Sequence, residues 1–103
     1  MIVTKITGTT FCGRQDTIRE LISRGILVKD AVVELIAEPS CKFDANARRC
    51  EIKGYTVGYV DREISGILAM LAQRGIYYIG IVEYIGEFKG EIGIRIRLQQ
   101  LAD

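Results

Sequence analysis

The residues best suited to chemistry lie together in one short segment, "EPSCKFDANARRC", which spans residues 38–50. Lys42, Phe43, Asp44 and Asn46 are nearly consecutive there, between two apolar runs. An aromatic ring such as Phe43 can stack on a nucleic-acid base, a contact worth ~1–3 kcal/mol. Ionised Asp44 only accepts hydrogen bonds and repels phosphate, so it should face a donor such as a free sugar hydroxyl. Together these residue types favour a site that binds the end of a nucleic-acid strand.

Basic residues near this segment could complete such a site, although the chain as a whole is nearly neutral. Its 14 basic and 13 acidic residues give a formal net charge of +1. Non-specific binders of duplex DNA usually carry a strong positive excess, so a nucleic-acid site here would depend on a local patch. The side chains that could neutralise phosphates in that patch are Lys42, Arg48, Arg49 and Arg62.

Turn chemistry gives a competing interpretation of the same segment. Asp44 and Asn46 are ordinary turn residues at the start of a strand, where they bond their own backbone. Phe43 would then only cover the end of the fold, and arginines such as Arg95 and Arg97 would form a solvated sheet face. Fold requirements alone explain these residues without a function.

The sequence lacks the usual components of a catalytic site. It contains no His, the commonest general base, and no Gly-rich phosphate-binding motif. Asp61 and Glu63 lie at the start of an expected helix, where they suit the cap and the helix dipole rather than acid–base work. We therefore expect a binding protein rather than an enzyme, with no cofactor.

The three cysteines, Cys12, Cys41 and Cys50, are widely spaced along the chain. A structural zinc site needs about four ligands, usually with a close Cys pair, and this chain has neither a CxxC motif nor a His. A zinc enzyme using these three cysteines would need a carboxylate ligand or a second chain. We expect reduced cysteines that act as small hydrophobic residues, and no bound metal.

The segments that must position these residues show clear periodicity. Two helices are predicted over residues 13–25 and 61–75, each ending at a glycine, with Asp61 as the N-terminal cap of the second. Lys53-Gly54 is typical of a hairpin turn. Strands are predicted over residues 2–10, 31–37, 47–53, 55–60, 76–86 and 91–100.

The order of these segments, β-α-β-β-β-α-β-β, indicates the fold class. Short connections favour antiparallel pairing, and the strand glycines Gly58, Gly80 and Gly93 suggest bulges or bends that curl a sheet. We predict a mainly β fold with two helices (α+β by composition) that forms a small, six-stranded, partly closed barrel. An open α+β sheet is the alternative. Arg95 and Arg97 share one face of the last strand, which should point towards solvent.

Length and hydropathy suit one domain over residues 1–103. The chain has 103 residues, of which 49% are hydrophobic, enough for a single core. No apolar run reaches the ~18 residues that a membrane span requires, and no signal-peptide pattern is present. We expect a cytoplasmic protein without a membrane partner.

Three blocks of the sequence resemble the HIRAN domain family: "TKITGTTFCGRQ", "EPSCKFDANA" and "GYTVGYVDREIS". Their order and spacing are also similar to the family, and the resemblance spans nearly the whole chain, as in stand-alone bacterial or phage members. The resemblance implies a modified OB-like β-barrel with two helices that binds single-stranded DNA and holds a free 3′-hydroxyl end. OB barrels commonly bind single strands by stacking and by following the backbone.

The resemblance also implies roles for individual residues. Asp44 matches the acidic residue that contacts the terminal 3′-hydroxyl, and Phe43 stands where a tyrosine usually stacks on the terminal base. Asn46 matches a structural asparagine of the loop. Tyr59 and Arg62 match the block beside the DNA path, where Arg62 would contact phosphate with Tyr59 in support.

Several positions depart from the family pattern. Cys41 replaces a usual asparagine, and Arg48 stands where an aliphatic residue is expected. Translocase members of the family carry a basic residue and an aromatic residue on the first strand. In this sequence Thr4 and Lys5 replace them. Lys5 would still hold phosphate, so weaker phosphate contacts are expected from Lys5, Lys42 and Arg48.

Two functions follow from these observations. The leading hypothesis is a non-catalytic module for single-stranded DNA or DNA 3′ ends, in DNA repair or replication-fork processing. The alternative is a protein-interaction module that docks a helicase or a nuclease through an exposed strand edge or the arginine-bearing face of the last strand. The near-neutral charge favours the alternative.

Overall fold

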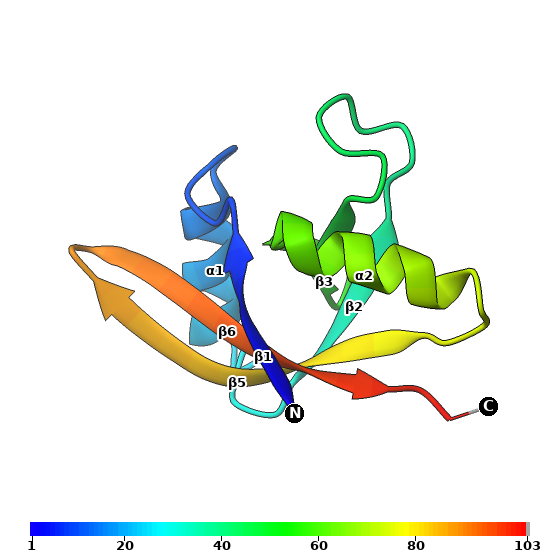
Figure 1. The fold of residues 1–103 in the computed structure, drawn as a ribbon. Helices are drawn as coiled ribbons and strands as arrows, with labels where there is room; N and C mark the ends of the chain where they lie inside the picture. The colour runs from blue at the N-terminus through cyan, green and yellow to red at the C-terminus, as the bar shows by residue number, and fades with distance from the viewer. Residues whose placement is uncertain (103) are drawn as a thin grey trace.

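The computed structural model describes residues 1–102. It confirms the predicted order of six strands and two helices (Figure 1). The elements are β1 (Ile2–Thr7), α1 (Arg14–Ser23), β2 (Val32–Ala37), β3 (Arg48–Ile52), β4 (Tyr55–Val60), α2 (Arg62–Ala72), β5 (Tyr78–Phe88) and β6 (Glu91–Gln100).

The six strands form a closed antiparallel barrel in the order β1-β4-β3-β2-β5-β6. β1 closes it by pairing with two neighbours: residues 2–5 pair with β6, and Ile6 and Thr7 pair with β4. The predicted OB-like small barrel is therefore confirmed, and the open sheet is wrong. Neither helix in residues 1–102 is long and apolar enough to cross a membrane.

The core follows from alternation along the strands. In β6 every second residue is buried and its neighbours are exposed or half-buried, the pattern of a strand with one face on a core. Both helices add apolar side chains to this core, Ile18 and Leu21 from α1 and Leu68 from α2. Burying each such side chain contributes about 1.5–3 kcal/mol. The β6 residues in the core are Ile92, Ile94, Ile96 and Leu98.

Local signals fixed several boundaries as predicted. The Asp61 side chain accepts a hydrogen bond from the Glu63 backbone N–H at 3.1 Å and so caps α2. Lys53 and Gly54 have φ angles of 50° and 84°, as a type I′ hairpin turn between β3 and β4 requires. Ile52 and Tyr55 pair directly across this turn.

Three predicted details are wrong. β1 ends at Thr7 instead of residue 10, because Gly8 has a φ of 69° and turns the chain out of the strand. β5 begins at Tyr78 instead of residue 76, since the Ile76 N–H bonds back to the end of α2. Gly93 lies in regular pairing within the ladder, whereas the expected bulge does occur beside Gly58.

Candidate functional site

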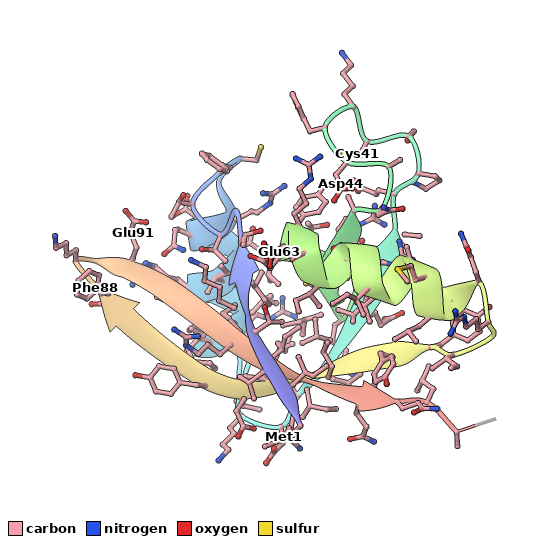
Figure 2. The ribbon with its side chains drawn as sticks, in the orientation of Figure 1. Met1, Cys41, Asp44, Glu63, Phe88 and Glu91 are labelled. Carbon is pink, nitrogen blue, oxygen red and sulfur yellow. The ribbon has the colours of Figure 1, made fainter. Side chains whose placement is uncertain are left out.

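The loop of residues 38–47, between β2 and β3, presents an aromatic ring at the surface. The Phe43 side chain is 85% exposed, and Lys42 beside it is also exposed. Two backbone hydrogen bonds, from Cys41 N to Glu38 O and from Ala47 N to Asp44 O, each 3.1 Å long, hold the two halves of the loop in tight turns. The loop projects from the ends of its two strands, with Cys41 and Asp44 upon it (Figure 2). The backbone of this loop is therefore held by its own hydrogen bonds, while the Phe43 ring is left open to solvent.

Asp44 makes an Asx turn inside this loop. Its Oδ1 accepts a hydrogen bond from the Asn46 backbone N–H at 2.9 Å, as the turn interpretation of the sequence predicted. Oδ2 accepts no hydrogen bond from residues 1–102. An ionised carboxylate has about four acceptor positions, so the turn orients Asp44 and leaves it acceptor capacity. Arg48 supports the same turn by donating from Nη1 to the Asn46 carbonyl at 3.1 Å.

A polar network at the base of the loop joins it to β3 and β4. Glu38 Oε2 accepts a hydrogen bond from the Tyr59 hydroxyl at 2.9 Å, and Oε1 accepts one from Arg49 Nη1 at 2.6 Å. Arg49 Nε also donates to Glu51 Oε2 at 2.5 Å. The bonds from Arg49 and Tyr59 hold the pKa of the Glu38 carboxyl below its usual value. Burial, followed by the bond to Glu38, raises the pKa of the Tyr59 hydroxyl.

Arg14 completes this network from the start of α1. Its guanidinium carbon lies 5.2 Å from the centre of the Tyr59 ring, within the range of a cation–π contact. Arg14 Nη1 also donates to the Gly8 carbonyl at 2.8 Å. One face of the Tyr59 ring is therefore occupied, and its hydroxyl is bonded to Glu38. These contacts hold the Tyr59 side chain in place at the base of the loop.

The Glu38 network was not predicted from the sequence, in which Arg49 was expected to neutralise a phosphate; in the structure Arg49 pairs with Glu38 and Glu51. Counting back from the Lys53-Gly54 turn in a regular hairpin places Tyr59 opposite Arg48. A bulge between the Cys50 and Glu51 pairs shifts the register, and Tyr59 instead pairs with Arg49. Gly58 was the available signal for this bulge, but its consequence for the partner of Tyr59 could not be read from the sequence.

The remaining predicted residues lie in different surroundings. Arg62 is exposed at the first position of α2 and makes no ion pair with any of residues 1–102. Arg48 is half-buried and lines a cavity of about 290 Å³ with Leu68 and Tyr77. Lys5 lines a separate groove on the other side of β1. The structure thus joins Phe43, Asp44 and Asn46 in one loop, links Tyr59 to its base, and leaves Lys5 outside this site.

The cysteines do not come together. Cys12 is exposed, Cys41 is half-buried in the loop, and Cys50 is buried in β3. Within residues 1–102, no three His, Cys, Asp or Glu side chains are close enough to hold a metal ion. Burial raises the pKa of the Cys50 thiol to about 12, so this thiol stays protonated.

Comparison with known proteins identifies the fold. No protein-family model matches the sequence, and no curated protein matches it. The crystal structure of the HIRAN domain of human HLTF is similar, with 18% identity, coverage of 94% of this chain and 73% of that chain, and a TM-score of 0.66. A structural-genomics protein from Lactobacillus plantarum is also similar, with 22% identity, coverage of 96% and 93%, and a TM-score of 0.71. The chain therefore has a HIRAN-like fold.

Proposed function

We propose that this HIRAN-like barrel is a binding module for single-stranded DNA that holds the strand at a free 3′-hydroxyl end. The observation that carries the proposal is the loop of residues 38–47. There the exposed Phe43 is followed in sequence by the half-buried Asp44, whose carboxylate the Asx turn orients. A protein that used this loop only to reverse the chain would gain nothing from an uncovered phenyl ring.

The proposed contacts follow from the chemistry of each side chain. Phe43 stacks on the terminal base, and Asp44 Oδ2 accepts the hydrogen bond of the 3′-hydroxyl. A 3′-phosphate would bring negative charge against Asp44 and is rejected. Arg62 and Lys42, both exposed, bind the phosphates that precede the end, and Arg48 adds a weaker contact. The proposal contains no catalytic step. It includes a role for the module in DNA repair or replication-fork processing.

The first test compares two labelled single strands, one ending in a 3′-hydroxyl and the other in a 3′-phosphate, by fluorescence anisotropy. The wild type should prefer the hydroxyl end. Asp44→Asn retains an acceptor for the Asx turn but loses the charge, and it should abolish this preference. Phe43→Ala should weaken binding by about five-fold or more. Glu20→Gln, a change of an exposed carboxylate on α1, is the matched control and should behave like the wild type.

Equal affinity of the wild type for both ends would refute 3′-end recognition and leave a general single-strand site. Binding that does not weaken as salt rises would refute the phosphate contacts, because each contact on a single strand contributes a slope of about −0.7 in log K against log salt.

A second candidate function is docking of a helicase or nuclease, and one surface favours it. Tyr77 is 56% exposed and Leu101 is 44% exposed, and the Leu101 N–H bonds to the Tyr77 carbonyl at 2.8 Å. Tyr77 also lines the cavity beside Arg48. Co-purification of a stoichiometric protein from the native host, without any DNA affinity of the barrel, would support this function over the first.

A further inference from the structure

The cavity beside Arg48 lies between α2 and residues of three strands, β2, β3 and β5. Leu68 of α2 forms part of its wall, and β5 begins shortly after the turn that follows this helix (Figure 1). Leu35, Ile76 and Tyr77 also line it. Its volume of about 290 Å³ is close to the lower limit of small-ligand pockets, about 300 Å³. The cavity therefore suits one apolar side chain or a group of similar size.

Among the described residues that line this cavity, Arg48 alone is charged. It is half-buried and makes no ion pair with any of residues 1–102. Two other half-buried arginines, Arg49 and Arg97, each contact two carboxylates. The Arg48 guanidinium has five N–H donors, and Nη1 gives one of them to the Asn46 carbonyl at 3.1 Å. A carboxylate is the group that best complements this cation, because it accepts two parallel bonds from a guanidinium.

The barrel wall opens beside this cavity. Pairing of β2 with β5 ends at Val33, within the part of the chain that the structure describes. The Ala31 carbonyl accepts a hydrogen bond from the Val82 N–H at 2.9 Å, so the backbone of Ala31 faces β5. Because this direction alternates along an antiparallel strand, the N–H and C=O groups of Leu35 and Ala37 also face the β5 side, beyond the last pair. They offer hydrogen bonds to an extended chain, which a free small acid in the cavity would not use.

We propose that this cavity binds the last residue of a partner polypeptide that ends in an apolar side chain such as leucine, with its carboxylate on Arg48. In a terminal residue the carboxylate and the side chain leave the same carbon atom, so both fit a small cavity. Inside an extended segment neighbouring side chains point to opposite faces, which separates an acidic side chain from an apolar neighbour. The inference deepens the second candidate function, protein docking, and does not depend on DNA binding. It shares with the DNA site only Arg48, the weaker of the proposed phosphate contacts.

The test measures fluorescence anisotropy of a labelled Gly-Ser-Gly-Ser-Leu peptide with a free carboxyl end. The same peptide with a C-terminal amide should bind about ten-fold more weakly or worse, and a peptide ending in serine about five-fold more weakly. Arg48→Gln should remove the preference for the acid over the amide. Tyr77→Ala should weaken binding of the leucine peptide by about five-fold. Arg74→Gln, a change of an exposed arginine just after α2 and outside the cavity lining, is the matched control.

The outcomes separate this inference from the two functions proposed above. No binding of the leucine peptide up to about 1 mM protein, or equal binding of acid and amide, overturns it, while co-purification and DNA anisotropy still decide those functions. An acetylated peptide with an internal Asp-Leu pair that binds as tightly would overturn recognition of a chain end. N-acetyl-leucine that competes as well as the pentapeptide would overturn a polypeptide partner. Should Arg48→Gln not fold, Ala37→Leu fills the cavity from an exposed position and should abolish peptide binding.

Discussion

Glu38→Gln should lower the free energy of unfolding by about 1 kcal/mol, although it keeps the size and shape of the side chain. Glu38 accepts two hydrogen bonds, from Arg49 at 2.6 Å and from Tyr59 at 2.9 Å. Bonds to an ionised group contribute about 1.5–3 kcal/mol, roughly twice the neutral value. The glutamine retains weaker neutral bonds, Arg49 keeps its bond to Glu51, and the Glu38 side chain is 24% exposed to screening solvent. These terms reduce the expected loss to about 1 kcal/mol.

Urea denaturation followed by circular dichroism measures this loss, and thermal unfolding should show a midpoint lower by roughly 4–8 °C. Glu87→Gln is the matched control, because its pair with Arg19 is far more exposed and should contribute little. Tyr59→Phe should cost less in the Glu38→Gln background than in the wild type. Strict additivity of these two changes, or a Glu38→Gln loss no larger than that of Glu87→Gln, would refute the reasoning.

Three further predictions concern pH, backbone geometry and thiol reactivity. Because the folded-state pKa of Glu38 lies below the ordinary value of 4.5, its contribution is complete above pH 4.5 and is lost as pH falls through the folded-state pKa. Glu38→Gln should therefore flatten the acid side of a plot of urea midpoint against pH, and an unchanged profile would contradict this. Gly58→Ala should destabilise by roughly 3 kcal/mol or more in urea denaturation, since a Cβ would overlap the backbone of β1 at a φ of 155°. Gly66→Ala, in open space on α2, should instead stabilise by about 0.5–1 kcal/mol. A thiol reagent should label exposed Cys12 in the folded protein and Cys50 only after unfolding; fast labelling of Cys50 in the folded state would disprove its protection.

The fold was largely predictable because its signals are local. The Lys53-Gly54 turn and the Asp61 cap depend on neighbouring residues, and β6 alternates along its whole length. The end of β1 was not predictable in the same way. Thr9 and Thr10 suit a strand by residue type, but Gly8 adopts a left-handed conformation and the chain turns there.

The candidate site was predictable only where its residues are close in sequence. Phe43, Asp44 and Asn46 belong to one loop, so a single motif identified them together. The Glu38–Tyr59 bond joins the first residue of the loop after β2 to β4, a strand that does not neighbour β2 in the barrel, and it depends on the bulge that moves Tyr59 next to Arg49. Gly58 indicates a bulge but not which residue then faces Tyr59, so the network could not be predicted.

The pairing of β1 with β6 has a consequence for how the protein folds and opens. Ile2 pairs with Leu98, so the contact between β1 and β6, the β1 seam, joins residues from opposite ends of the sequence. By contrast, β3 with β4 and β5 with β6 form local hairpins. Closing so long a loop carries the greater entropic cost, so the hairpins should form first and the β1 seam last. In the folded state the amide hydrogens of this seam should exchange before those of the hairpins. The barrel would then open as a flap at β1 while most of its core remains intact.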